Sequence, residues 1–274
     1  MYNIPQALTI AGSDSGGGAG IQADLKTFQM RGVFGTTAIT AVTAQNTLGV
    51  YDIHAVPLAT IEAQLKAIAE DFQISAFKLG MLGTAEIIEC VAESLKAHTF
   101  GLMVLDPVMI AKGGAPLLQQ SAVSALKQHL LPLADIITPN LPEAETLTGI
   151  RIIDDKSAEQ AARYLQDRGA KTVVIKGGHS QHSQSAVCRD RVFTPSDTFM
   201  LESPRYQTPH THGTGCTFSA CITAELAKGH NPNIAIRLAK QFITAAISRP
   251  LNIGHGHGPT NHWAFSSIPR QGLG

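Results

Sequence analysis

Cysteine, net charge and long apolar runs are all scarce in this sequence. Its 274 residues include 4 cysteines, and 21 basic residues balance 21 acidic ones. Because the cysteines form no CxxC pair and no metal-like spacing, a disulfide framework and a structural zinc site are both disfavoured. The balanced charge offers no general field that would attract nucleic acid or an anionic membrane. These absences favour a small-molecule ligand.

No apolar run reaches membrane-spanning length, and the first five residues lack the pattern of a signal peptide. We therefore expect a cytoplasmic protein with reduced thiols. Hydrophobic residues make up 44% of the chain, which suffices for a sizeable core. Since no linker, repeat or low-complexity stretch interrupts it, we expect a single domain over residues 1–274, with a frayed tail at 266–274.

Short apolar runs alternate with amphipathic segments through most of the chain. This alternation predicts a mostly parallel sheet with helices on both faces. Residues 186–206 break the rhythm and predict an antiparallel hairpin at the sheet edge. The expected strands are 7–11, 36–44, 77–82, 102–108, 136–138 and 172–176. The expected helices are 19–30, 85–97, 121–130, 158–168, 214–228 and 232–247, and apolar residues at 61–72 also have helical spacing.

Unusual polar and glycine residues follow several of these predicted strands. They lie at 12–14, 80–81, 106–107, 138–140 and 176–178. In parallel sheets, ligands bind outside the carboxyl ends of the strands. The sequence therefore predicts one binding site on that rim.

The run His212-Gly213-Thr214-Gly215-Cys216 opens an apolar helical stretch. Backbone N–H groups and the positive end of the helix dipole would meet there and bind an anion. Cys216 at its mouth could act as a base or nucleophile if its thiol pKa is lowered.

A glycine-rich loop at 16–20 separates the first strand from its helix. The spacing Gly18-x-Gly20-x-x-Ala23 fits a loose dinucleotide fingerprint, but the acidic residue expected about twenty positions later is missing, and no GxxxxGK[ST] occurs. This disfavours a dinucleotide oxidoreductase and favours close backbone approach to a small ligand. Asp24 lies inside the following helix, and its position alone predicts a solvated charge or an acid that faces the helix dipole.

Four further polar residues have both a local and a functional interpretation. Asp106 is either a cap or a catalytic or metal-linked carboxylate. Asn140 could cap a helix with Glu143 in its first turn, or both could lie near a magnesium–phosphate unit. Lys176 ends an apolar run and is costly to bury without an anion, so reaching a phosphate is favoured. By contrast, a metal site among the histidines at 254–262 is disfavoured, and Cys221 is expected to pack in the core.

Taken in order along the chain, these motifs resemble the ribokinase-like superfamily. Within it they resemble the hydroxymethylpyrimidine/phosphomethylpyrimidine kinases of thiamine biosynthesis. The resemblance covers residues 7–265. The motifs that carry it are AGSD at 11–14, GGAGIQADLKT at 17–27, GML at 80–82, LDPVMIAK at 105–112, TPNLPE at 138–143, KGGH at 176–179, HGTGCT at 212–217 and GP at 258–259.

The resemblance implies an α/β three-layer sandwich with a small β flap over the substrate. It implies ATP-dependent phosphorylation of 4-amino-5-hydroxymethyl-2-methylpyrimidine and then of its monophosphate, with ATP and Mg²⁺, in a homodimer. Gln45 then matches the residue that reads the pyrimidine edge, with Gly12, Ala19, Asp24 and Met81 as neighbours. The remaining positions match as follows: Asp106, Asn140 and Glu143 the magnesium–phosphate region, Lys176 the nucleotide phosphates, Gly213, Thr214, Gly215 and Cys216 the anion hole, and Lys240 the adenine-side helix.

Three positions bear on the substrate. The superfamily usually has Asp where this chain has Cys216, and that replacement is characteristic of the pyrimidine kinases and of a related pyridoxal-kinase branch. Related pyridoxal kinases often carry a second cysteine where this chain has Ala111, so Ala111 and Gln45 favour the pyrimidine. A pyridoxal kinase, or dual activity, stays the nearest alternative. A non-catalytic binding protein on the same fold is disfavoured because the acids, Lys176 and the whole loop are retained.

Overall fold

A computed structural model describes residues 4–110, 114, 117–178 and 186–265 of the chain. Its strands form one nine-stranded sheet in the order β3-β2-β1-β4-β5-β6-β7-β8-β9. The strands are β1 Gln6–Asp14, β2 Phe34–Gln45, β3 Val50–Ala55, β4 Ala76–Leu79, β5 Leu102–Leu105, β6 Ile136–Ile137, β7 Thr172–Ile175, β8 Val187–Phe193 and β9 Thr198–Pro204. The six central strands run parallel to one another; they are β2, β1, β4, β5, β6 and β7. At the two edges, β3, β8 and β9 pair antiparallel with their neighbours. The mostly parallel sheet and its antiparallel edge hairpin are therefore confirmed.

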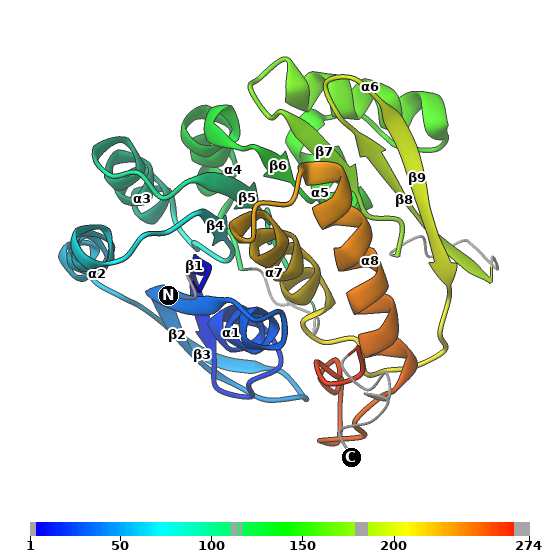
Figure 1. The fold of residues 1–274 in the computed structure, drawn as a ribbon, viewed down its shortest axis with the longest axis horizontal. Helices are drawn as coiled ribbons and strands as arrows, with labels where there is room; N and C mark the ends of the chain where they lie inside the picture. The colour runs from blue at the N-terminus through cyan, green and yellow to red at the C-terminus, as the bar shows by residue number, and fades with distance from the viewer. Residues whose placement is uncertain (1–3, 111–113, 115–116, 179–185, 266–274) are drawn as a thin grey trace.

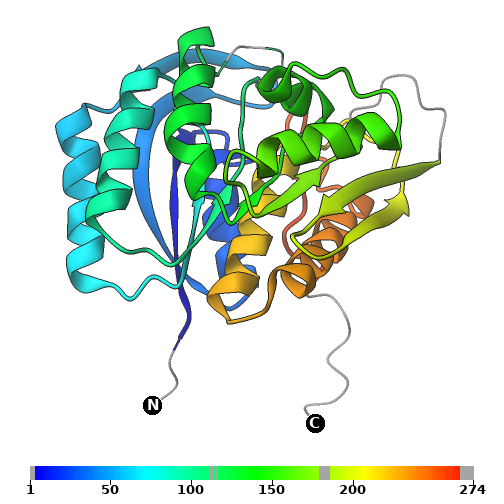
Figure 2. The ribbon, with the colours of Figure 1, turned by 90° about the horizontal axis from the view of Figure 1, so that it is seen from above.

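Helices cover both faces of this sheet (Figures 1 and 2). They are α1 Gly20–Met30, α2 Leu58–Asp71, α3 Ala85–Ala97, α4 Gln120–Ala125, α5 Leu141–Thr148, α6 Asp155–Gln166, α7 Thr214–Ala227 and α8 Pro232–Ser248. Residues of α2 to α6 pack in one hydrophobic cluster, and those of α1, α7 and α8 pack in a second cluster on the opposite face. None of the helices in the described ranges has the length and hydropathy that a membrane crossing requires.

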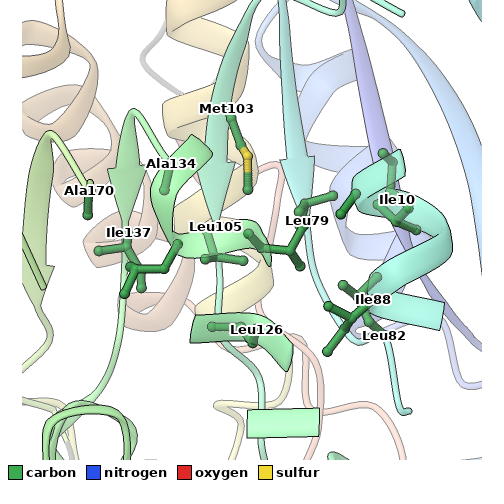
Figure 3. Packing of buried hydrophobic residues seen from close by; sticks show 14 of the residues in the cluster. Ile10, Leu79, Leu82, Ile88, Met103, Leu105, Leu126, Ala134, Ile137 and Ala170 are labelled. Carbon is green, nitrogen blue, oxygen red and sulfur yellow. The ribbon is translucent and has the colours of Figure 1, made fainter. Parts of the chain in front are cut away.

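The strands divide their side chains between the two clusters. On β5, Met103 and Leu105 face the first cluster, where Figure 3 shows them among residues of β4 and β6, whereas Val104 faces the second. Because both faces are covered, these strands are largely apolar instead of alternating, and Lys78 of β4 is the one charged residue among them. This explains why continuous apolar runs predicted the strands correctly.

Several boundaries differ from the prediction. The expected strands at 77–82 and 102–108 end earlier, at Leu79 and Leu105, so the residues after them are free to form loops. The expected helix at 121–130 starts at Gln120 and continues after Ala125 as a π-helical turn, Leu126–Leu130. Strand β3 was not predicted as a strand. Five of its six residues are exposed, so it lacks the alternation of a half-buried strand.

Candidate functional site

A cavity of about 650 Å³ opens at the carboxyl ends of the parallel strands. Side chains from the loops after β1, β4, β5, β6 and β7 all line it, which confirms that the rim residues converge. Of the residues predicted for the site, all but Asp24 line this cavity. They are Gly12, Ala19, Gln45, Met81, Asp106, Asn140, Glu143, Lys176, Gly213, Thr214, Gly215, Cys216 and Lys240.

The predicted anion loop has the expected geometry. Gly213 is the N-cap of α7 and has φ +79°, a left-handed conformation that favours glycine. Thr214 Oγ1 donates to the carbonyl of Thr211 at 2.7 Å. A Cβ built on Gly215 would lie 3.4 Å from Nζ of Lys176, so the lysine ammonium group lies within contact distance of the loop. The N-terminus of α7 therefore lies beside the cation of Lys176, and this arrangement suits a bound phosphate.

Lys176 and Asp106 form an ion pair at the base of the cavity. Lys176 Nζ lies 3.1 Å from Asp106 Oδ1, and Ser219 Oγ donates to the other carboxylate oxygen at 3.2 Å. Although burial raises the pKa of Asp106, the charges of Lys176 and Lys78 lower it below its ordinary value. The carboxylate is thus ionised at neutral pH.

Asn140 and Glu143 form the capping box of α5. Asn140 Oδ1 accepts from the backbone N–H of Glu143 at 2.9 Å, and Glu143 Oε2 accepts from the backbone N–H of Asn140 at 2.7 Å. The local interpretation of this pair is confirmed, and both residues also line the cavity. Burial and the neighbouring charge of Asp106 raise the pKa of Glu143 to about 7, against the opposing charge of Lys176.

Asp24 does not fit the reading of a solvated acid. Its side chain is fully buried, its Oδ1 lies 2.8 Å from Nζ of Lys78, and its Oδ2 accepts from Thr9 Oγ1 at 2.6 Å. It lies behind the cavity wall, while Lys78 lines the cavity. Sequence reasoning missed Lys78, although a lysine between Phe77 and Leu79 in an apolar run is the same signal that identified Lys176.

The glycine-rich loop is held by Asp14, which the sequence placed among the rim residues at 12–14 without assigning it a role. Its carboxylate accepts from the backbone N–H groups of Gly16, Gly18 and Ala19 at 2.8–3.0 Å. It also lies 2.8 Å from Nε2 of His212. These contacts connect the loop before α1 to the anion loop before α7.

Lys240 lies at the cavity but is paired. Its Nζ is 2.8 Å from Asp190 Oδ2, and Asp190 Oδ1 accepts from the backbone N–H of Gly177 at 3.0 Å. The pair therefore connects α8 to the segment after β7. Ala111, the remaining residue used above, lies outside the described residues.

Comparisons with known proteins agree with this geometry. A family model described as phosphomethylpyrimidine kinase matches residues 14–261. The hydroxymethylpyrimidine/phosphomethylpyrimidine kinase of Haemophilus influenzae is 71% identical over 98% of this chain and 100% of its own length. The thiamine biosynthesis bifunctional protein ThiED of Geobacter sulfurreducens is 49% identical over 93% of this chain and 51% of its own length.

A solved structure, an ADP complex of Bacillus subtilis pyridoxal kinase, has a TM-score of 0.87. It is 42% identical, and the match covers 96% of this chain and 99% of that one. Its likeness confirms the ribokinase-like fold, and its ADP agrees with a nucleotide site in a protein of this shape. Pyridoxal kinase is a structural neighbour, whereas the family match and the relative that is 71% identical both name the pyrimidine kinases. The chain belongs to the phosphomethylpyrimidine kinase family and is a phosphotransferase.

Proposed function

We propose that this protein uses ATP to phosphorylate 4-amino-5-hydroxymethyl-2-methylpyrimidine and then its monophosphate, in thiamine biosynthesis. The observation that carries the proposal is the composition of one cavity. It joins an amide suited to a pyrimidine edge, Gln45, to an anion loop at a helix N-terminus and to the Lys176–Asp106 pair. The names of its relatives support the same acceptor.

Asp106 and Glu143 are the residues that would hold Mg²⁺. Both are oxygen donors that line the cavity beside Lys176. Mg²⁺ commonly takes one or two protein carboxylates and completes its shell with phosphates and water, so this donor set fits. When bound, the ion supplies neutralising charge to the ATP phosphates. Lys240 would contact the nucleotide if the ATP phosphates replace Asp190 as the partner of its ammonium group.

The protein's own residues then position the groups and stabilise charge. Lys176 neutralises charge on the transferring phosphoryl group, and the backbone N–H groups of Gly213 to Cys216 bind its oxygens. The acceptor hydroxyl lies beside Cys216, which takes its proton or shapes the anion hole. Gly12, Ala19 and Met81 line the same cavity, and we assign them to the side that would receive the flat ring.

An acceptor screen with the full chain tests this proposal. Initial rates with ATP are measured for the hydroxymethylpyrimidine, its monophosphate and pyridoxal, with products identified by mass spectrometry. We expect both pyrimidines to be phosphorylated in turn, and kcat/KM for the hydroxymethylpyrimidine to exceed that for pyridoxal. A higher kcat/KM for pyridoxal would assign the protein to the alternative function. If no ATP is consumed with the pyrimidines or with pyridoxal, both the proposed function and the alternative are contradicted.

We also infer a homodimer in the cytoplasm, on the strength of the resemblance. Sedimentation equilibrium at micromolar concentration tests the assembly, with a mass of one chain as the contradicting result.

A further inference from the structure

Asp14 accepts hydrogen bonds on both of its carboxylate oxygens. Oδ1 accepts from Gly16 N, and Oδ2 accepts from Gly18 N and Ala19 N. Although burial raises the pKa of Asp14, the hydrogen bond and charge of His212 and these backbone donors lower it below its ordinary value. Asp14 is therefore a carboxylate at neutral pH and can only accept hydrogen bonds.

This determines where a proton sits on His212. Its Nε2 is 2.8 Å from Asp14 Oδ2, and both side chains are almost fully buried. Two acceptors at that distance would repel each other, so Nε2 carries a hydrogen and donates it to Asp14. This holds whether the ring is neutral or protonated.

The hydrogen on Nε2 in turn determines the orientation of Gln45. One terminal atom of its amide lies 3.4 Å from His212 Nε2, and the other lies 3.4 Å from Thr43 Oγ1. An NH₂ group facing His212 would meet a donor. It would also leave the single hydroxyl hydrogen of Thr43, already donated to the carbonyl of Ser13 at 2.8 Å, facing a second acceptor. With the amide turned over, its NH₂ donates to Thr43, and its oxygen faces the N–H of His212 instead of a second donor. The single hydrogen of His212 Nε2 is then shared between Asp14 at 2.8 Å and the Gln45 oxygen at 3.4 Å.

We propose that His212 is a specificity-determining residue that holds the Gln45 amide oxygen toward the anion loop and its NH₂ toward Thr43. The site then selects an acceptor with an amino donor next to its hydroxymethyl group and a ring-nitrogen acceptor beyond that. His212 begins the loop that binds the phosphoryl group, so the hydroxymethyl end of the acceptor lies on its side of Gln45. This inference rests on the proposed function, because it explains how the same cavity distinguishes its pyrimidine.

The proposed acceptor matches that order of groups. In 4-amino-5-hydroxymethyl-2-methylpyrimidine the 4-amino group is adjacent to the carbon that bears the hydroxymethyl group, and N3 lies on its other side. The amino group then donates to the Gln45 oxygen while N3 accepts from the Gln45 NH₂. The 4-oxo analogue has the same ring but presents an acceptor oxygen and an N3–H donor. Its oxygen would face the Gln45 oxygen, and its N3–H would face the Gln45 NH₂. A site that leaves buried polar groups unpaired rejects such an analogue strongly.

The test compares kcat/KM for the amino and 4-oxo acceptors in the full chain, H212Q and H212M. The terminal nitrogen of glutamine can occupy the place of histidine Nε2 and donate to Asp14, whereas methionine has similar length and no donor. We expect H212Q to keep the wild-type ratio within about threefold and H212M to lower it at least about tenfold. A general loss of loop order would reduce both acceptors alike and leave the ratio unchanged. An unchanged ratio in H212M overturns the proposal.

A second measurement does not depend on the variants folding or on the acceptor. In the ¹⁵N-labelled wild-type protein, nuclear Overhauser effects from the Gln45 NH₂ protons report which neighbour they face. We expect contacts to the methyl group of Thr43 and none to the ring protons of His212; the reverse pattern overturns the proposal. If instead the wild type phosphorylates neither pyrimidine while the amide is oriented as expected, it is the proposed function that fails.

Discussion

Lys78 Nζ lies 2.8 Å from Asp24 Oδ1, and neither side chain is exposed to solvent. The lysine comes from β4 and the aspartate from α1, so the pair connects the centre of the sheet to a covering helix. Burial lowers the pKa of Lys78, but the charges of Asp24 and Asp106 raise it above its ordinary value. The cavity therefore has a permanent cation in its wall, neutralised from behind.

Removing one member of this pair should destabilise the fold strongly. In K78M the carboxyl group of Asp24 stays buried without its partner, and burial raises its pKa with no opposing cation. Breaking a buried pair in this way typically costs about 3–5 kcal/mol. The double variant K78M/D24N removes both charges, so we expect it to be more stable than the sum of the two single losses. Urea unfolding of the four proteins measures this coupling. As a control, K66M removes an exposed pair with Glu70 and should change stability by less than about 1 kcal/mol. Strict additivity of K78M and D24N would contradict the pairing.

Gly213 is expected to tolerate no side chain, for two separate reasons. Its φ of +79° is strained for any other residue, and a built Cβ would overlap the carbonyl oxygen of Gly18. Gly229 is a matched control, because its φ is +86° but no atom lies within 4 Å of a built Cβ. We expect G229A to lose about 1 kcal/mol from backbone strain alone. G213A should lose more and should reduce kcat at least about tenfold, because the anion loop must move away from Gly18. Equal stability and wild-type kcat in both variants would show that this contact does not hold the loop.

The rim of the sheet was predictable because its signals are local. Asp106 and Lys176 each follow an apolar strand, and the chain direction in a parallel sheet brings such positions to one edge. The glycines of the anion loop likewise predict a tight turn before a helix. The roles of these residues can therefore be predicted from the five or six residues around each of them.

The pairings behind that rim were not predictable from the same signals. Asp24 could be read as solvated because its partner Lys78 is 54 residues away, and neither position predicts the other without the register of β1 beside β4. Asp14 and His212 are 198 residues apart. Strand β3 was missed for a different reason. An exposed edge strand has no buried face to impose a period of two on its sequence.

Acid should weaken the fold through His262. Its Nε2 lies 3.0 Å from Thr217 Oγ1, in the first turn of α7 just after the anion loop. Burial and the charge of Lys26 lower the pKa of His262 to about 4. An unfolded histidine titrates near pH 6.5, so between these values the unfolded chain binds more protons than the folded one. The stabilisation is complete above about pH 6.5 and falls as the pH falls toward 4, by up to about 3 kcal/mol.

Urea unfolding at pH 7.5, 5.5 and 4.5 measures this dependence. H262Q keeps a side chain that can bond to Thr217 but cannot titrate, so its stability should vary less with pH than that of the wild type. The exposed His54 provides the control, and H54Q should follow the wild-type curve. An identical pH dependence in H262Q and the wild type would contradict the assignment.

The environment of Cys216 bears on whether it can act as a base. Burial and the charges of Asp24 and Asp106 raise the pKa of its thiol to about 11, although Lys78 acts in the opposite direction. At pH 7 only about one thiol in ten thousand is ionised in the site without ligand. The helix N-terminus therefore does not make Cys216 a standing thiolate. A base role requires substrate binding to lower the pKa of this thiol, so that a thiolate is present to take the hydroxyl proton as phosphoryl transfer begins.

The two phosphorylation steps separate these roles of Cys216. The first acceptor is a neutral alcohol that must lose a proton, whereas the second is a phosphate that is largely ionised already. If Cys216 takes the proton, C216A should lower kcat of the first step by about 100-fold or more and that of the second step far less. C221A is the matched control, since Cys221 lies on the same helix but is buried in the core and lines no part of the cavity. It should change stability and leave the ratio of the two steps unchanged. Equal losses in both steps of C216A would exclude the base role and assign Cys216 to shaping the anion hole.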